Sequence, residues 1–266
     1  LYPNDNKMSG KELRLKQQYF FVSASIQAAI EKYKKTHNDI KKLHEKVVFQ
    51  MNDTHPTVAV AELMRILMDE EGLGWDEAWE VTTKSVAYTN HTIMSEALEK
   101  WPISYLERVV PQLVPIIRKL DEKVRARFSD KSVYIIDDSN RVHMAHMDIH
   151  YGHSVNGVAY LHTEILKNSE LNNFYRIYPE KFNNKTNGIT FRRWLMSCNP
   201  ELSAMITDLI GDGWKKDANE LEKLGNFVND DAVLVWTETP SPYDVAPIWL
   251  TSVTSVYAVL SKGQAT

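Results

Sequence analysis

Cysteine is almost absent from this chain, which has 266 residues and only one cysteine, Cys198. A single cysteine excludes an internal disulfide bond and fits a reducing, cytoplasmic setting. No apolar run reaches the roughly 18 residues that a membrane-spanning helix needs, and the sequence contains no internal repeat. The formal net charge is only -4, which argues against a basic surface for nucleic acids or anionic membranes.

The two ends of the chain also lack expected features. Residue 1 is leucine rather than methionine, and no basic leader or apolar signal core follows it. We therefore expect the chain to be a segment of a longer protein. The stretch 235–266 holds only three charged side chains, against 25% charged residues overall, so it does not resemble the sequence that precedes it.

Hydrophobic residues are plentiful, at 43%, which is enough for one or two packed cores. Helical spacing of apolar residues predicts a helix over 111–128, and the strongly apolar stretch 19–30 predicts a helix over 11–35 that is buried on most sides. Strands that lead through polar loops into helices are typical of a layered α/β fold. The predicted strands lie at 46–51, 134–136 and 142–147. Further helices are predicted after Pro56 and over 75–88, 155–166 and 192–196, with two more before 228.

Three short runs place small polar side chains, with a histidine or glycine, in apolar surroundings. They lie at 52–56, 88–92 and 184–190. Burying such groups without partners costs a few kcal/mol each, about 1–3 for each hydrogen-bonding group. The pattern therefore indicates a ligand rich in hydroxyl groups.

Each run also has a structural interpretation that the residues alone leave open. Asp53 and His55 follow a strand, where open α/β sheets bind ligands, but Asp53 or Thr54 can equally cap the next helix. His91 can act as an acid or base, with nearby carboxylates at helical spacing, or can be a hydrogen-bonded core histidine. Asn187, before Gly188, offers donors and an acceptor to a sugar hydroxyl, but Asn-Gly also forms ordinary turns.

A histidine cluster at 143, 146, 150 and 153 suggests zinc, but we predict no metal site there. The cluster lacks cysteine ligands. It also overlaps the strand predicted at 142–147, in which residues three apart point to opposite faces.

The three polar runs and several longer segments resemble the glycogen (α-1,4-glucan) phosphorylases, which are pyridoxal-phosphate-dependent glycosyltransferases. The similarity covers residues 1 to about 234. Motifs of this length and number are highly specific. Besides the three runs they include Leu1–Asn6, Gly10–Gln17, Glu96–Pro102, Val155–Ala159 and Phe191–Leu195.

The resemblance implies a helix-rich α/β fold, a fragment of a two-domain, Rossmann-like glycosyltransferase of the GT-B type. Residues 1–186 would be the later part of the N-terminal domain, and 187–234 the start of the C-terminal pyridoxal-phosphate domain. Residues 235–266 match nothing in the family, and a change of reading frame would account for them.

The resemblance also implies a reaction and its partners. Phosphorylases cleave the terminal α-1,4 bond of glycogen or maltodextrin with inorganic phosphate, release glucose 1-phosphate, and are typically cytoplasmic homodimers. The cofactor is pyridoxal 5'-phosphate, and its Schiff-base lysine would lie outside this chain. We therefore expect the isolated chain to be inactive. The alternative is a non-catalytic remnant that binds carbohydrate or another subunit.

Site residues follow from the same resemblance. His91 matches a catalytic histidine that supports the oxocarbenium-like transition state electrostatically, and Trp194 matches a residue near the cofactor. The matches to glucan-contacting positions are Asp5, Asn6, Asp53, Glu96, Glu99 and Asn187.

Three positions depart from regulated animal members of the family. Glu31 and Lys32 replace two adjacent arginines, which argues against AMP binding because a carboxylate repels phosphate. Lys7 replaces an aromatic residue that stacks on purine-like inhibitors.

Overall fold

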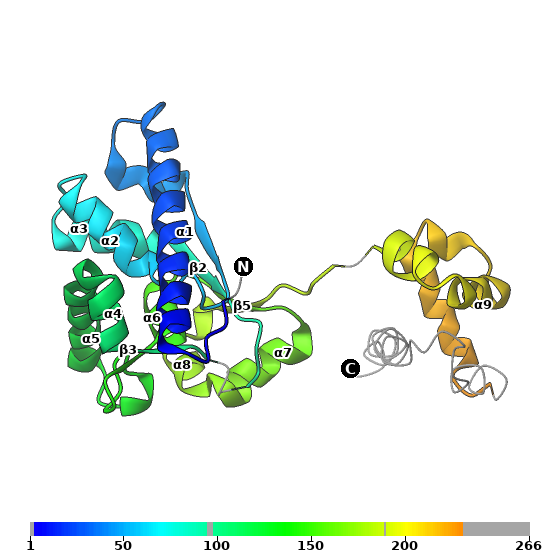
Figure 1. Cartoon of the computed structure of the whole chain (residues 1–266). Helices are drawn as coiled ribbons and strands as arrows, with labels where there is room; N and C mark the ends of the chain where they lie inside the picture. Colours follow the sequence, from blue (N-terminus) through cyan, green and yellow to red (C-terminus); the bar gives the residue numbers. More distant parts are fainter. Residues whose placement is uncertain (1–2, 95–97, 189, 231–266) are drawn as a thin grey trace. The chain divides into compact units, whose positions relative to one another are not determined.

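The computed structural model describes residues 3–94, 98–188 and 190–230. The chain divides into two compact units, Leu1–Asn187 (unit 1) and Gly188–Thr266 (unit 2), each with its own hydrophobic core (Figure 1). Among the helices formed by these residues, none is both long and apolar enough to cross a bilayer.

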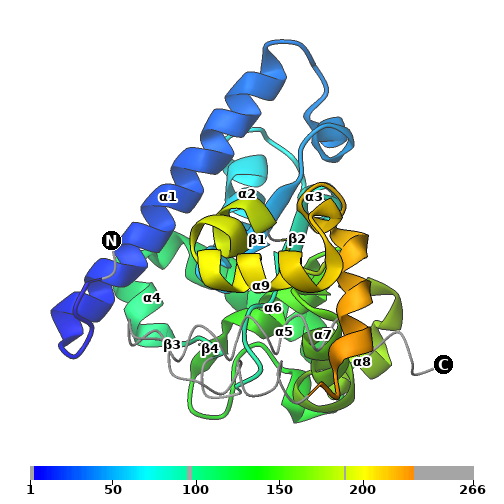
Figure 2. The same ribbon diagram turned by 90° about the vertical axis from the view of Figure 1, so that its right-hand side faces the viewer.

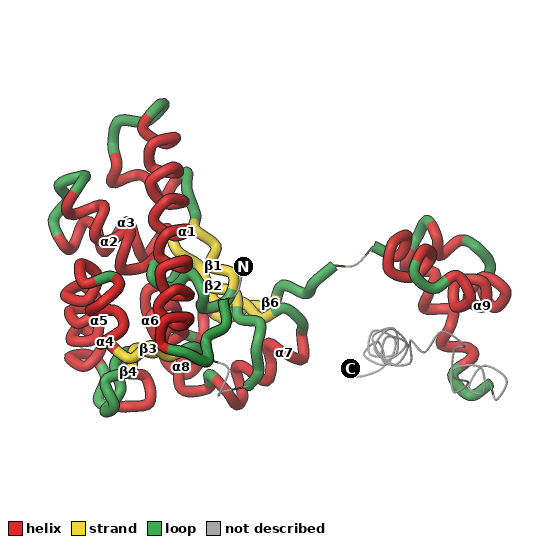
Figure 3. Tube along the Cα trace, in the orientation of Figure 1, coloured by secondary structure: helices red, strands yellow, loops and turns green. Residues whose placement is uncertain are grey.

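A parallel sheet of four strands lies in unit 1 (yellow in Figure 3). Its order is β1-β2-β5-β6, and the register pairs Asn52 with Thr89 and Thr89 with Asn156. Because all four strands run in the same direction, their carboxyl ends lie at one edge of the sheet. The strands are β1 (Phe49–Asn52), β2 (Val86–Thr89), β5 (Val155–Gly157) and β6 (Phe182–Asn184), and a separate antiparallel pair joins β3 (Lys100–Pro102) to β4 (Arg141–His143).

Helices supply most of the core of unit 1. The longest, α1 (Met8–Lys34), passes along one side of the unit (Figures 1 and 2). The other α-helices are α2 (Ala59–Asp69), α3 (Trp75–Ser85), α4 (Ile103–Val109), α5 (Val114–Arg127), α6 (Met144–Tyr151), α7 (Tyr160–Ile165) and α8 (Asn172–Ile177). Shorter helical segments are η1 (Ile40–Glu45), η3 (Pro111–Leu113), η4 (Lys131–Val133), η5 (Leu166–Glu170) and η6 (Pro179–Lys181).

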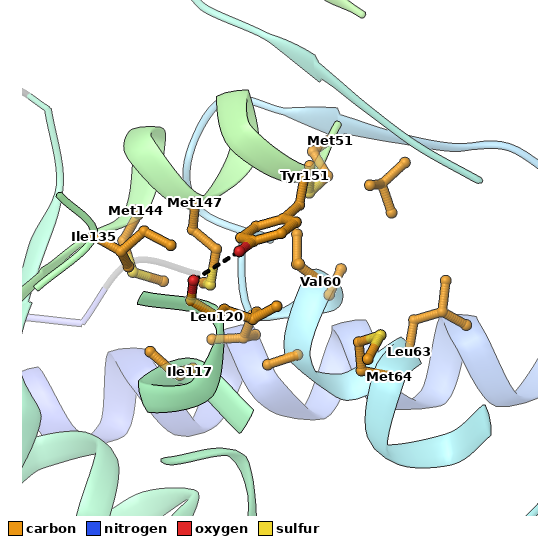
Figure 4. Packing of buried hydrophobic residues seen from close by; sticks show 14 of the residues in the cluster. Met51, Val60, Leu63, Met64, Ile117, Leu120, Ile135, Met144, Met147 and Tyr151 are labelled. Atoms are coloured by element: carbon orange, nitrogen blue, oxygen red, sulfur yellow. Dashed lines mark hydrogen bonds between the residues drawn. The ribbon is translucent and has the colours of Figure 1, made fainter. Parts of the chain in front are cut away.

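Side chains from α2, α5 and α6 meet in the interior (Figure 4). Val60 lies near Leu120 and Met147, while Leu63 lies beside Met64, and none of these side chains has exposed surface. The Tyr151 hydroxyl donates to the Leu120 carbonyl oxygen at 2.7 Å, so this buried hydroxyl is satisfied.

Several predicted elements are wrong. Residues 86–88, predicted as the end of a helix, belong to β2, and 155–157, predicted as the start of a helix, form β5. Conversely, 144–147 belong to α6 rather than to a strand, and 134–136 contribute only a bridge from Ile136 to Val142. Strands of a parallel sheet are covered on both faces and lack the alternation that identifies a strand.

Unit 2 is small and helical. Trp214 is the centre of its core and is 1% exposed. Asn199 caps α9 (Pro200–Ile210) by accepting a hydrogen bond from the Leu202 N–H at 3.0 Å. The remaining segments are η7 (Arg192–Ser197), η8 (Gly213–Lys215) and η9 (Ala218–Phe227).

Candidate functional site

Polar loops follow the four parallel strands at the carboxyl edge of the sheet. The first begins with Asp53, the second with Asn90, the third after Gly157 and the fourth with Lys185. The first two polar runs and the beginning of the third, residues 184–187, therefore lie at the same edge. This is the edge at which open α/β sheets bind ligands.

The loop after β1 has a strained backbone at its first residue. Asp53 has a φ of 67°, in the left-handed region, which costs about 1–3 kcal/mol for a residue other than glycine. Its N–H donates to the Thr89 carbonyl at 2.9 Å, and its carboxylate accepts from the Thr54 N–H at 2.6 Å. Neither residue caps α2, which begins at Ala59 without a side-chain cap, so the capping interpretation is wrong.

The loop after β2 presents His91 to solvent, so the interpretation of His91 as a core histidine is wrong. Its Nε2 is hydrogen-bonded to Asn52 Oδ1, which joins the ends of β2 and β1. Asn90 beside it is fully buried, and its Oδ1 accepts from the Thr92 N–H at 2.9 Å. The loop therefore has a buried anchor and an exposed imidazole.

His162 of α7 connects this loop to the loop after β5. Its Nδ1 accepts from the Val158 N–H at 3.1 Å, so its Nε2 carries the proton. That nitrogen lies 3.1 Å from Asn90 Oδ1 and 3.2 Å from the Thr92 carbonyl oxygen. One neutral imidazole thus fixes the relative position of two site loops.

Glu99 accepts hydrogen bonds from three parts of the fold. Gln18 Nε2 of α1 lies at 2.8 Å, Trp101 Nε1 at 2.9 Å and Thr54 Oγ1 at 3.2 Å from its carboxylate. His55 Nδ1 is 3.9 Å away. Glu99 precedes β3 and lies on no helix, so the predicted helical pairing with Glu96 is wrong for this residue; Glu96 itself lies outside the described residues.

Two other predicted site segments have fewer contacts. Asn187 is exposed, and its N–H donates to the Val158 carbonyl oxygen at 3.0 Å, beside the loop after β5. A Cβ added at Gly188 would meet no atom of the described residues within 4 Å, so the space beside this glycine is open. Near the N-terminus, Asn6 is exposed and its N–H donates to Asn4 Oδ1 at 3.1 Å, while Asp5 is half-buried.

Trp194 lies in unit 2, with 54% of its surface exposed. The Arg193 guanidinium carbon lies 4.8 Å from the centre of its ring. An exposed indole beside a guanidinium is suited to a planar ring that carries a negative group.

The histidine cluster is occupied by protein contacts. His146 Nδ1 bonds to the Tyr134 carbonyl oxygen at 2.7 Å, and His143 Nε2 lies 3.0 Å from an Asp137 carboxylate oxygen. Burial, with a smaller contribution from His143, lowers the pKa of His146 to about 3. Within the described ranges, no group of three or more His, Cys, Asp or Glu side chains can hold a metal ion.

Sequence reasoning missed several residues that shape this edge, namely Gln18, Trp101, Thr57, Asp148 and His162. Their types are ordinary, and their roles come from contacts across long sequence separations. A signal existed only for His162, which follows the polar end of β5, and it required recognising 155–157 as a strand.

Comparison with known proteins identifies the family that the sequence resembles. The chain matches the carbohydrate phosphorylase family over residues 1–239. It is 56% identical over 234 residues to maltodextrin phosphorylase of Streptococcus pneumoniae, an alignment that covers 88% of this chain and 31% of that protein. It is 46% identical over 242 residues to glycogen phosphorylase of Bacillus subtilis and 45% identical over 253 residues to the brain form of Rattus norvegicus, covering 88% of this chain and 30% of each relative.

The chain thus spans slightly less than a third of the length of these relatives. The resemblance of the sequence is confirmed by a family match that covers most of the chain, including the whole sheet and its polar loops. This chain belongs to the carbohydrate phosphorylase family.

Proposed function

We propose that this chain is part of an α-1,4-glucan phosphorylase, which cleaves terminal α-1,4 bonds with inorganic phosphate and releases glucose 1-phosphate. The observation that carries the proposal is the convergence of three polar runs at one sheet edge, in a chain 56% identical to a maltodextrin phosphorylase. The substrate would be glycogen or maltodextrin, and the complete enzyme a cytoplasmic homodimer.

The proposed architecture is a GT-B arrangement of two Rossmann-like domains. Residues 1–186 would belong to the N-terminal domain and 187–234 to the start of the C-terminal domain. The division of the chain into compact units after Asn187 supports this boundary. The stretch 235–266 lies outside the described residues, and the family match extends to residue 239.

The proposed catalytic residue is His91, which would stabilise positive charge on the reacting sugar without transferring a proton. Its ring is exposed and is held by Asn52, so it can contact a ligand in a fixed orientation. Glu99 would also position the loop after β1, because its carboxylate accepts from Thr54 as well as from Gln18 and Trp101. The proposed glucan contacts are Asp5, Asn6, Asp53, Glu96, Glu99 and Asn187.

Pyridoxal 5'-phosphate is the proposed cofactor, and Trp194 and Arg193 suit an aromatic ring and a phosphate group. When bound, it supplies a phosphate group beside the substrate phosphate. The residues of this chain position the glucan, and the polar edge of the sheet binds its hydroxyl groups. Glu31 and Lys7 argue against regulation by AMP or purine-like inhibitors.

A chimera tests the proposal in a complete enzyme. Residues 1–234 replace the matching segment of the Streptococcus pneumoniae relative, and release of glucose 1-phosphate from maltoheptaose and phosphate is measured. We expect activity in the chimera and none in the isolated chain. His91→Ala should lower kcat about 100-fold, and Asn187→Ala should lower kcat/KM about tenfold.

The matched control is Asn38→Ala, which removes an exposed asparagine outside the sheet edge and should leave both constants unchanged. A folded chimera without activity would contradict the proposal. If it still binds maltoheptaose, the function becomes that of a carbohydrate-binding remnant.

A further inference from the structure

Beneath the loop after β1, a buried carboxyl group contacts a buried hydroxyl. Asp148 of α6 and Thr57 have no exposed surface, and Asp148 Oδ2 lies 2.6 Å from Thr57 Oγ1. Thr57 Oγ1 also lies 2.8 Å from the Thr54 carbonyl oxygen. The other carboxyl oxygen of Asp148 has no hydrogen-bond partner within the described structure.

Counting protons assigns the direction of these two hydrogen bonds. A threonine hydroxyl has one proton to donate, and a carbonyl oxygen can only accept. The Thr57 proton therefore goes to the Thr54 carbonyl oxygen. The contact of 2.6 Å between Thr57 Oγ1 and Asp148 Oδ2 then needs a proton from Asp148.

The opposite assignment is unfavourable. If Asp148 were ionised and accepted the Thr57 proton, Thr57 Oγ1 and the Thr54 carbonyl oxygen would face each other at 2.8 Å without a proton between them. One oxygen of the buried carboxylate would also have no donor, and an unpaired buried charge is costly.

The charges around Asp148 favour the neutral form as well. Burial raises the pKa of Asp148 well above its ordinary value, the contact with Thr57 lowers it, and Glu99 and Asp53 raise it. Tyr88 is also fully buried, and burial, with a smaller contribution from Asp148, raises the pKa of its hydroxyl well above the ordinary value. Two carboxyl groups, Glu99 and Asp53, therefore oppose a negative charge on Asp148.

We propose that Asp148 is a neutral carboxylic acid that donates to Thr57 and thereby positions the loop Asp53–His55 of the glucan site. Thr54 transmits the effect: its carbonyl is held by Thr57, its N–H donates to Asp53, and its hydroxyl donates to Glu99. The strained backbone at Asp53 needs such an anchor to persist. The positioning role rests on the proposed function, but the protonation state does not.

Infrared difference spectroscopy on the whole chain tests the protonation state. At about pH 7, where free aspartate is ionised, wild type minus Asp148→Asn should show the carbonyl band of one neutral carboxylic acid. The difference spectrum for the control Asp130→Asn, at an exposed position, should lack that band. A carboxylate signal lost in Asp148→Asn would overturn the proposal.

Conservative variants in the chimera test the positioning role. Asp148→Asn retains a donor for Thr57 and should keep KM for maltoheptaose, while Asp148→Leu should raise it about tenfold. If Asp148→Leu does not fold, Thr57→Ser and Thr57→Val give the same comparison. Equal KM values within either pair would overturn the role.

Amide resonances of Thr54 and His55 in the isolated chain report the loop independently of activity. These resonances should shift in Asp148→Leu and keep their wild-type positions in Asp148→Asn. Identical resonances in the two variants would also overturn the positioning role of Asp148. If the unsubstituted chimera is inactive, the proposed function is rejected. The comparison of amide resonances then decides alone whether Asp148 positions the loop.

Discussion

The buried ring of His150 makes the stability of unit 1 sensitive to acid. Its Nε2 lies 2.8 Å from the Val133 carbonyl oxygen and donates to it, and its Nδ1 lies 3.0 Å from the Tyr178 hydroxyl. Burial lowers the pKa of His150 from 6.5 to about 4; the bond to Val133 opposes this shift, and Lys181 and Arg127 add to it. The neutral ring is therefore the form that the fold accommodates.

The sign and size of the effect follow from linkage. A lowered pKa means that the folded state binds the proton less readily than the unfolded state. The stabilisation is complete above about pH 6.5, declines as the pH falls, and is lost below about 4. At about 1.4 kcal/mol per pH unit, the whole interval corresponds to about 3 kcal/mol.

Urea unfolding between about pH 7 and 4.5 measures this slope. His150→Phe should lower the free energy of unfolding at about pH 7, because the Val133 carbonyl loses its donor. Its pH slope below 6 should nevertheless be about 1.4 kcal/mol per unit smaller than that of the wild type. His153→Phe, at an exposed position, is the matched control and should keep the wild-type slope. The same slope in His150→Phe and the wild type would refute the reasoning.

Two further predictions concern buried positions in unit 1, and both are measured by urea unfolding. Asp121 is 5% exposed, and its carboxylate accepts hydrogen bonds from the backbone N–H groups of residues 135 and 136 at 2.9 and 3.0 Å. Asp121→Ala should therefore lower the free energy of unfolding by about 3 kcal/mol. A loss below about 0.5 kcal/mol would contradict this prediction. A Cβ at Gly157 would overlap the Thr163 hydroxyl, so Gly157→Ala should lower the free energy of unfolding by about 1–3 kcal/mol. Gly188→Ala should lower it less, because the space there is open. Equal losses in the two variants would contradict this prediction.

The helices were predictable where local spacing determines them. The spacing over 111–128 predicted α5, which is Val114–Arg127, and the prediction for 11–35 corresponds to α1, Met8–Lys34. In both, the buried residues repeat every three or four positions, because the helix itself has that period.

The central strands were not predictable in this way. Val86, Ala87 and Tyr88 are at most 2% exposed, so both faces of β2 are buried and no alternation appears. β5 has only three residues and is followed, after residues 158 and 159, by α7. What makes these segments strands is their pairing with β1 and β6, which are distant in sequence.

The polar runs of the candidate site were visible because polar residues in apolar surroundings need partners. Asp53, His91 and Asn187 belong to three different runs, and the parallel topology places the runs at one edge. The residues that fix them were not visible. Thr57 and His162 acquire their roles only from contacts to Asp148 and Asn90, which lie 91 and 72 positions away in sequence.

Three carboxyl groups near one sheet edge raise the question of how their mutual repulsion is tolerated. Glu99 and Asp53 retain exposure and accept hydrogen bonds from Gln18, Trp101 and Thr54. Asp148 has neither exposure nor a full set of donors. If Asp148 keeps its proton, it donates a hydrogen bond to Thr57 beneath the loop after β1, while Glu99 and Asp53 accept hydrogen bonds. The carboxyl groups that stay accessible are then those to which the hydroxyl groups of the proposed glucan can donate.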